Sequence, residues 1–398
     1  MSGDQPEQAA SLVIASRGAT RPLEPLGLDP VAIAALGFDV EGWGPSTVAE
    51  VLQRNGALGL VVTHGGRLVY EWYAPESAAS RRNPCFSVTK SLTGTMTAAA
   101  VAAGLLDRDA RVGELIPELA GSGFRDATVG DVADMTVSLG YDEDYDDASA
   151  PSADGTALGF GNYLVAAGLA DGAPDAPRSI RALLARIGAG PEPHGHTFTY
   201  ATPVSDMLGW LLERARGRAF AELLVEHIWS PMGAERDAFV VCDPAGTPLM
   251  GGGLSATTRD LARIGLLLND RSREELDEDP PAGSARGTGA STDAGAATVT
   301  APITPAVIGS MRGGGDRDAF ARSHYAYLRG YSYRDQWWVT GDRSLSGWGI
   351  HGQLLWVDPD ADVVIATHCG GPSASDARRD LEQDALCRAI VAASAEWT

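Results

Sequence analysis

Two predicted β-hairpins, one near each end of the chain, constrain the fold more than any other feature. In residues 57–73 two apolar runs are separated by a Gly-Gly pair, which reaches the positive φ angles of a tight turn at low cost. Residues 350–357 and 362–368 flank the turn-forming sequence DPDA. Because hairpins build antiparallel sheets, we expect one antiparallel sheet that takes strands from both ends of the chain.

The chain between the hairpins has mainly helical patterns. Residues 86–106 place Val88, Leu92, Met96 and Ala99 on one helical face. Further helices are predicted for residues 179–187, 204–215, 219–229 and 374–392.

These patterns together predict an α/β (α+β) fold. Residues 1–106 and 247–398 form the sheet domain, which helices flank, and residues 107–246 form an inserted, mainly helical domain. We expect the active site to lie between the two. Residues 268–301 are rich in Gly, Ala, Ser and Asp and are predicted to be a flexible insertion.

The charge of the chain excludes some classes of partner. A formal charge of −21 and a pI near 4.6 disfavour nucleic acid, which needs clustered basic residues, and would repel an anionic membrane. No signal peptide or membrane-spanning run is visible, and the four cysteines have no metal-site or disulfide spacing. We therefore expect a cytoplasmic protein. Whether it forms a homodimer is left open.

Lysine usage points to one residue. Among the 31 basic residues, Lys90 is the sole lysine. Arginine can replace lysine wherever only a positive charge is needed, but guanidinium cannot give up its proton at physiological pH. Lys90 is therefore a candidate for proton-transfer chemistry.

Lys90 also belongs to an S-x-x-K motif, Ser87-Val88-Thr89-Lys90, at the predicted start of a helix. One helical turn separates the two side chains, so the amine can reach the Ser87 hydroxyl. A serine hydroxyl needs an adjacent base to become a nucleophile, and burial can lower the pKa of a lysine enough for it to serve. The backbone N–H of Ser87 is then a candidate oxyanion donor.

At this point the sequence resembles a known family, the serine hydrolases of the β-lactamase fold. The resemblance is to the class C and carboxylesterase branch, and is strongest to the 6-aminohexanoate-dimer (nylon oligomer) hydrolases. It extends from about Leu58 to His368. The strings that carry it, in order, are FSVTKSLTGT, IPELAGS, GYDEDYDD, FTYATPVSDMLGWLLERARG, GGGLSATTRDLARIG and RDQWWVTG followed by SGWGIHGQLLWVDP.

The resemblance implies roles for several residues. Ser87 corresponds to the acylated serine, Lys90 to its base, and Tyr200 to the tyrosine of the Y-x-N/S motif. We expect the nearby lysine to lower the pKa of the Tyr200 phenol, which could then pass the proton to the leaving group. The N–H of Ile350 is implied as the second oxyanion donor.

The third family motif is a strand triad, usually K-T-G or H-T-G. Gly347-Trp348-Gly349 occupies it in one register and His351-Gly352-Gln353 in the other. Both registers lack the lysine that helps to hold a β-lactam carboxylate.

Four further side chains are implied in substrate binding. Tyr145 corresponds to a tyrosine that holds the substrate amide in the nylon oligomer hydrolases, and Trp338 to a tryptophan that lines the cleft. Trp348 and His351 come from the two registers of the triad. Residues 250–253 have glycine where those relatives carry a polar side chain.

We therefore expect a serine hydrolase that cleaves short linear amides or carboxylic esters through a Ser87 acyl-enzyme. No metal or organic cofactor is required. The partner is a small-molecule amide or ester. The alternative is an acyltransferase of a biosynthetic pathway, in which an amine or alcohol accepts the acyl group from Ser87. A β-lactamase or D-alanyl peptidase fits less well, as does a non-catalytic binding protein.

Overall fold

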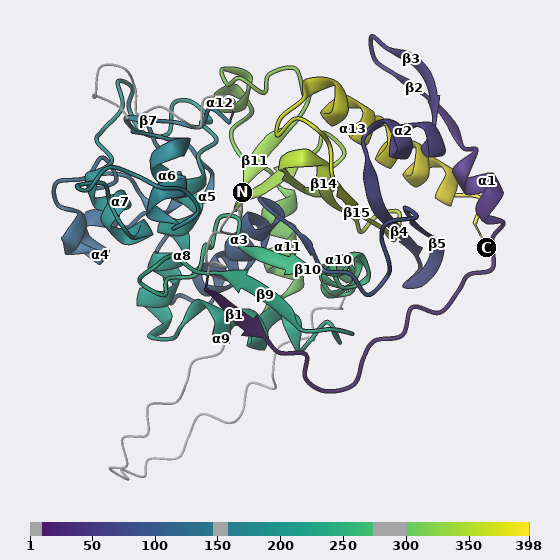
Figure 1. Cartoon of the computed structure of the whole chain (residues 1–398), viewed down its shortest axis with the longest axis horizontal. Coiled ribbons are helices and arrows are strands. Elements are labelled where there is room, and N and C mark those ends of the chain that lie inside the picture. The colour runs from purple at the N-terminus through teal and green to yellow at the C-terminus, as the bar shows by residue number, and fades with distance from the viewer. Residues whose placement is uncertain (1–9, 146–157, 274–300, 398) are drawn as a thin grey trace, which may run out of the picture.

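The fold is described from a computed structural model, which describes residues 10–145, 158–273 and 301–397 (Figure 1). Most of the predicted flexible insertion, residues 274–300, lies outside the described residues. Its first part is not a loop, because residues 268–273 complete helix α10 (Thr258–Arg273). Leu268 and Asn269 are buried, so the apolar face of this helix continues past the predicted boundary.

A seven-stranded antiparallel sheet forms the centre of the molecule. Its order is β11-β12-β13-β14-β15-β4-β5, so strands from both ends of the chain lie in one sheet, as the two hairpins predicted. The early strand β4 pairs directly with the last strand β15, with Val61 opposite Ala366. The strands are β4 (Ala57–His64), β5 (Arg67–Tyr73), β11 (Ser332–Arg334), β12 (Trp337–Val339), β13 (Leu345–Gly349), β14 (Gln353–Asp358) and β15 (Val363–Cys369).

The first hairpin turns at Gly65 and Gly66, whose φ angles of 58° and 72° suit residues without a Cβ. The second hairpin, β14 and β15, is also present. The predicted strand at residues 350–357 begins three residues too early, however. Residues 350–352 form a tight turn, η3 (Ile350–Gly352), in which His351 has a φ of 65°, a left-handed conformation that interrupts extended backbone.

Helices cover both faces of this sheet, because alternate strand residues point to opposite sides. One face packs against α3 (Val88–Ala102), α10 and α11 (Pro305–Arg312), and the other against α2 (Val48–Arg54) and α13 (Ala377–Ser394). Figure 1 shows α13 running along the sheet beside α2. The first face contributes Val61, Leu355, Val357, Val364 and Ala366, and the second Leu60, Val62, Leu354, Trp356, Val363 and Ile365.

A second, smaller sheet was not predicted from the sequence. Its order is β1-β9-β10-β6, and it brings residues near the N-terminus beside the strands that follow the helical stretch (Figure 1). These strands are β1 (Ser11–Ile14), β6 (Asn83–Pro84), β9 (Ala238–Val241) and β10 (Leu254–Ala256). Two further strand pairs are short, β2 (Gly37–Val40) with β3 (Gly44–Thr47), and β7 (Tyr141–Asp142) with β8 (Leu158–Gly159).

The middle of the chain is mainly helical, as predicted, and the three helices expected there are present with ends shifted by one or two residues. The last of them continues from α9 into one π-helical segment, η2. The domain division at residues 107 and 246 stays a prediction. The elements are α4 (Val112–Leu115), η1 (Pro117–Leu119), α5 (Val129–Ala133), α6 (Phe160–Ala166), α7 (Ile180–Arg186), α8 (Thr202–Arg216), α9 (Phe220–Leu224) and η2 (Val225–Trp229). The two other short helices of the described chain are α1 (Pro30–Ala34) and α12 (Arg317–Ala321).

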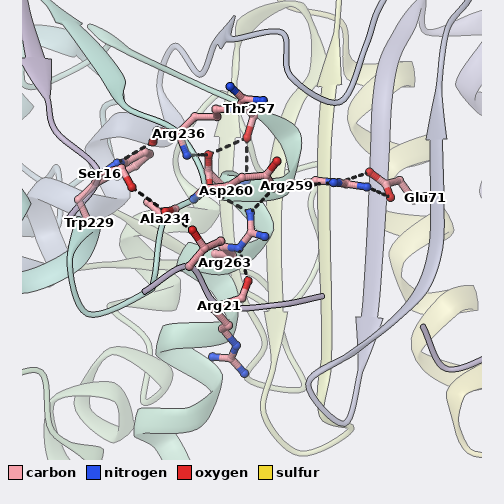
Figure 2. Close-up of polar contacts among 12 residues, drawn as sticks. Ser16, Arg21, Glu71, Trp229, Ala234, Arg236, Thr257, Arg259, Asp260 and Arg263 are labelled. Atoms are coloured by element: carbon pink, nitrogen blue, oxygen red, sulfur yellow. Dashed lines mark hydrogen bonds and ion pairs between the residues drawn. The ribbon is translucent and has the colours of Figure 1, made fainter. Parts of the chain in front are cut away.

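A polar network centred on the start of α10 ties together distant parts of the chain (Figure 2). Buried Asp260 accepts hydrogen bonds from Thr257 Oγ1 (2.8 Å) and from the backbone N–H groups of Glu235 and Arg236. Arg263 pairs with Asp260 at 3.0 Å and donates to the carbonyl of Arg21 at 2.9 Å. The N-terminal segment and the loop before β9 are thereby held against one helix.

Arg259 extends this network to the sheet, because its guanidinium forms two hydrogen bonds with the Glu71 carboxylate of β5, at 2.5 and 2.7 Å. In the part of the chain that the structure describes, no helix is both long and apolar enough to cross a membrane.

Candidate active site

Ser87 lies at the N-terminal end of α3, where a strained turn presents it to the cleft. The preceding residue, Phe86, has a φ of 44°, which a residue with a Cβ rarely adopts. Hydrogen bonds hold this turn, from the Cys85 N–H to the Leu254 carbonyl (2.8 Å) and from Thr89 Oγ1 to the Phe86 carbonyl (2.6 Å). Ser87 retains 8% of its surface exposed.

The Lys90 amine contacts the Ser87 hydroxyl directly. Lys90 Nζ lies 2.8 Å from Ser87 Oγ, 3.0 Å from Thr202 Oγ1 and 2.7 Å from the Gly251 carbonyl oxygen. The lysine is 1% exposed. Burial lowers the pKa of the Lys90 ammonium to about 8, against the opposing attraction of the Glu143 and Asp206 carboxylates.

Sequence reasoning did not identify these two carboxylates. Both oxygens of Glu143 contact Thr202: Oε2 accepts from its backbone N–H at 2.8 Å, and Oε1 accepts from its hydroxyl. Thr202 therefore links the Lys90 amine to Glu143. Glu143 lies in the acidic segment before Tyr145, and its position among other acidic residues gave no sign of a buried partner.

Asp206 lies one turn along α8 from Thr202 and is fully buried. It accepts hydrogen bonds from the Tyr163 hydroxyl (2.9 Å) and the Gly251 N–H (3.1 Å). Burial raises the pKa of Asp206 to about 7, although the Tyr163 hydrogen bond and the charge of Lys90 oppose the rise. Asp206 is the only charged residue in the sequence from Thr202 to Leu212, which was the one sequence signal that could have revealed it.

Tyr200 lies beside both Ser87 and Lys90. Lys90 Nζ is 5.1 Å from the centroid of the phenol ring, and the ring stacks on Trp338 with centroids 5.7 Å apart. The expected lowering of its pKa is wrong. Burial raises the pKa of the Tyr200 phenol well above its usual range, with Tyr333 adding to the rise and a hydrogen bond to Ser87 opposing it. Tyr200 is therefore a neutral phenol, because the loss of hydration on burial is the largest influence on its pKa.

The end of β13 forms the other wall of the site. A Cβ built on Gly349 would lie 3.1 Å from the Ser87 nitrogen, and one on Gly347 would lie 2.9 Å from Ser91 Oγ, so this strand runs closely along the start of α3. Gly352 instead packs against Arg379 and Cys369. The register with Gly347-Trp348-Gly349 as the triad therefore fits the geometry, and it leaves Ile350 next to Ser87 in the cavity wall.

The remaining predicted residues divide into two groups. Tyr145, Trp338 and Trp348 border the cavity over Ser87, and the Tyr145 hydroxyl donates to Glu143 Oε1 at 2.9 Å. His351 does not border that cavity. Its Nδ1 lies 2.8 Å from the Gly371 carbonyl oxygen, and its ring packs 5.5 Å from that of Phe86.

Three cavities that share Tyr145 in their walls lie in this region, and Ser87 lines two of them. A small one of about 40 Å³ lies directly over it and shares Tyr200 with a larger cavity of about 660 Å³, the acidic cavity. Asp142, Glu143, Asp144 and Asp376 contribute carboxylates to the acidic cavity. The third, the apolar chamber, has a volume of about 290 Å³ and is lined by Ser87 but not by Tyr200; its wall includes Phe86, Phe160, Leu164, Leu249, Gly251 and Gly252.

No group of three or more His, Cys, Asp or Glu side chains within the described residues is arranged to hold a metal ion. His194 accepts a hydrogen bond from the Ser138 N–H, whereas His196 pairs with Glu192. The two histidines of this His-Gly-His sequence therefore have separate partners.

Comparison with known proteins places this geometry in a family. The family model for Beta-lactamase matches residues 46–387, which is most of the chain. The chain belongs to the beta-lactamase family. It is a serine hydrolase of this family, and the fold and resemblance predicted from the sequence are confirmed.

Three known proteins illustrate what the chain is similar to. A 6-aminohexanoate-dimer hydrolase from Paenarthrobacter ureafaciens is 33% identical over 311 residues, which cover 77% of this chain and 70% of that protein. A solved structure from Bacillus anthracis, provisionally assigned the same activity, has a TM-score of 0.77 at 20% identity and covers 98% of this chain and 92% of its own. EstCE1, described as a hydrolase with promiscuous acyltransferase activity, has a TM-score of 0.57 at 15% identity, and the match covers 86% of this chain and 96% of EstCE1. The two structures show the shared fold.

Proposed function

We propose that Ser87 is the nucleophile and Lys90 its general base in an enzyme that cleaves short linear amides or carboxylic esters. The observation that carries this proposal is the 2.8 Å contact between Lys90 Nζ and Ser87 Oγ, made by a buried lysine whose pKa is lowered to about 8. A pKa near neutrality gives the enzyme a substantial fraction of free amine at physiological pH. That amine can take the Ser87 proton as the hydroxyl attacks the carbonyl carbon.

The tetrahedral intermediate needs donors for its oxyanion. We assign this role to the backbone N–H groups of Ser87 and Ile350. The close approach of Gly349 to the Ser87 nitrogen supports it, because Ile350 follows Gly349 directly and lines the same cavity as Ser87. Donors fixed by backbone need no reorganisation as the charge develops.

Collapse of the intermediate requires a proton on the leaving nitrogen or oxygen. Tyr200 is a neutral phenol beside Lys90, so it can donate its own proton to the leaving group while it accepts the one that Lys90 took from Ser87. The C–N or C–O bond then breaks, and the acyl group stays on Ser87 Oγ. Water attacks the acyl-enzyme by the reverse relay and restores the serine hydroxyl.

The relatives support the choice of substrate class. A relative at 33% identity is named for hydrolysis of the 6-aminohexanoate dimer, a linear amide, and we propose a short linear amide or ester for this chain. The strand triad Gly347-Trp348-Gly349 carries no cationic side chain, so a β-lactam carboxylate would lack a partner there. This disfavours a β-lactamase or D-alanyl peptidase.

Acyl transfer is the second candidate function. The acidic cavity of about 660 Å³ borders Tyr200, which leaves room for an amine or alcohol to approach the acyl-enzyme in place of water. The fold neighbour EstCE1 is described as having promiscuous acyltransferase activity. The lifetime of the acyl-enzyme separates the two functions.

Intact-protein mass spectrometry after mixing with p-nitrophenyl butyrate tests the proposal. We expect a butyryl adduct on the wild type and none on Ser87→Ala. Loss of the adduct in buffer alone supports hydrolysis, whereas a persistent adduct that added amines or alcohols remove supports transfer. An adduct that also forms on Ser87→Ala would place the nucleophile elsewhere.

We also propose a cytoplasmic location. All four cysteines, Cys85, Cys242, Cys369 and Cys387, are free thiols buried in the fold, and a reducing compartment maintains such thiols. Fractionation of the source cells with an antibody to the chain would test it, and recovery in a secreted fraction would contradict it.

A further inference from the structure

The apolar chamber differs in chemistry from the two cavities that Tyr200 borders. Within the described residues, its wall contains no Asp, Glu, Lys, Arg or His. Of its hydroxyl groups, that of Tyr163 is committed to Asp206 and that of Thr202 to Glu143. A charged group placed in this chamber would therefore lose its hydration without gaining an ionic partner.

The position of Tyr200 decides which part of a substrate enters the chamber. Tyr200 borders the acidic cavity and the small cavity over Ser87, but not the apolar chamber. If Tyr200 protonates the leaving group, as the proposed function requires, that group departs on the Tyr200 side. The acyl group then has the cavity that Ser87 lines without Tyr200, which is the apolar chamber.

We propose that the apolar chamber is the acyl site and that it selects uncharged aliphatic acyl groups over acyl groups with a terminal ammonium. This inference rests on the proposed function and adds the class of acyl group. The volume of about 290 Å³ gives room for on the order of ten water-sized groups, since a water occupies about 30 Å³ in the liquid. A medium-length acyl chain fits that space, and the acidic cavity is left for an amine-bearing leaving group.

Gly252 keeps the chamber open. A Cβ built on Gly252 meets only the Phe86 carbonyl carbon, at 4.0 Å, so a side chain can be added there without a clash at its base. The two neighbouring glycines cannot be changed in this way. A Cβ on Gly251 would lie 2.9 Å from the Thr202 carbonyl oxygen, and one on Gly253 would lie 2.8 Å from the Leu249 carbonyl oxygen.

The first experiment measures kcat/KM for p-nitrophenyl acetate, butyrate and hexanoate, and for p-nitrophenyl 6-aminohexanoate. Burial of each methylene contributes about 0.8 kcal/mol, so we expect kcat/KM to rise roughly three- to fourfold per methylene from acetate to hexanoate. The 6-amino ester has the hexanoate chain with a terminal ammonium. We expect its kcat/KM to be lower than that of hexanoate by roughly a hundredfold or more. Equal values for these two esters would overturn the inference.

The second experiment compares Gly252→Leu with Gly252→Ala and the wild type. We expect Gly252→Leu to reduce the hexanoate-to-acetate ratio of kcat/KM at least tenfold, because its side chain takes space on the order of one to three methylenes of the acyl chain. The ratio for Gly252→Ala should lie between those of Gly252→Leu and the wild type. Because both esters are assayed on one preparation, any loss of folded enzyme cancels from the ratio. An unchanged ratio in Gly252→Leu would show that the acyl group lies elsewhere.

The failure of this inference is distinguishable from the failure of the proposed function. If none of the esters acylates Ser87, the mechanism is wrong and the acyl site falls with it. If acetate forms the Ser87 adduct but neither chain length nor the terminal ammonium changes kcat/KM, the mechanism stands and only the acyl site is wrong.

Discussion

Lys90 is held between two opposing influences. Complete burial disfavours its ammonium form, whereas Glu143 and Asp206 favour it, and burial is the larger effect. In this position the amine contacts Ser87, and Thr202 and the Gly251 carbonyl orient it. The environment of Lys90 therefore sets both the pKa of its amine and the orientation of that amine toward Ser87.

Replacement of the proposed base tests this arrangement. Lys90→Arg keeps a positive charge but removes a group that can deprotonate, so we expect kcat/KM for p-nitrophenyl butyrate to fall about a thousandfold. Circular dichroism at the assay temperature checks that the variant is folded. A folded Lys90→Arg enzyme with near-normal kcat/KM would exclude Lys90 as the base.

The pH dependence of acylation follows from the lowered pKa of Lys90. The free amine is the active form, and below a pKa of about 8 its fraction falls tenfold per pH unit. We therefore expect kcat/KM to rise with pH, to level off above about pH 8, and to be roughly a hundredfold lower at pH 6. A profile measured from pH 6 to pH 10 that stays level between pH 6 and pH 9 would contradict this.

Glu143 should set the midpoint of that profile. Its negative charge raises the pKa of Lys90, so Glu143→Gln should move the acidic limb to lower pH, by roughly one unit. Asp142→Asn is the matched control, because Asp142 is an exposed neighbour. A shift to higher pH, or equal shifts in both variants, would argue against a charge effect of Glu143 on the lysine.

The sequence could reveal Ser87 and Lys90 because the two residues are neighbours on one helical turn. Glu143, Asp206 and Gly251 come from other parts of the chain, and their contacts depend on how those parts pack. No local pattern marks such contacts. The same dependence explains the error on the Tyr200 pKa, because the extent of its burial is a property of the packed aromatic cluster.

At the scale of single elements, α3 is the helix on which the site depends. It is buried over most of its length and packs closely on the turn between β11 and β12. A Cβ on Gly94 would lie 1.9 Å from the carbonyl oxygen of Asp335, and Ser91 Oγ donates to the Gln336 carbonyl at 2.9 Å. The turn and the helix therefore fix each other's position.

Gly94→Ala tests this contact. In an exposed helix the change would stabilise by about 1 kcal/mol, but here the turn must move, and we expect a loss of about 3 kcal/mol in the free energy of unfolding. Urea denaturation measures it. Gly121→Ala, where no heavy atom lies within 4 Å of the added Cβ, should stay within about 1 kcal/mol of wild type. Similar stabilities for the two variants would contradict the close packing.

The elements differed in how well the sequence predicted them. The long hairpin of β4 and β5 was found because its apolar runs and its Gly-Gly turn are both local signals. Strands β1, β6, β9 and β10 were missed because each has only two to four residues, too few to show alternation. Their pairing depends on contacts with segments that are distant in the sequence.

At the scale of the whole molecule, the network around Asp260 joins the N-terminal segment, the loop before β9 and the sheet through one helix (Figure 2). Asp260→Asn removes the charge from a fully buried carboxylate that faces Arg263. We expect a loss of about 3 kcal/mol in the free energy of unfolding, measured with guanidinium chloride, because buried Arg263 would lose its buried anionic partner and keep only Glu235, whose side chain is 27% exposed.

Asp270→Asn provides the comparison for this prediction. Asp270 pairs with Arg21 in the same region, but its side chain is 50% exposed, so its loss should cost no more than about 1 kcal/mol. If Asp260→Asn is no more costly than Asp270→Asn, the buried network contributes little to the stability of the fold.

The pairing of β4 with β15 has a consequence for synthesis of the protein. The two strands lie side by side in the sheet but are separated by most of the chain. During translation, β4 leaves the ribosome long before β15 exists, with one edge of its backbone unpaired. An apolar strand in that state can pair with a neighbouring nascent chain. The yield of active enzyme will therefore depend on conditions during synthesis, and lower temperature or added chaperones should raise it.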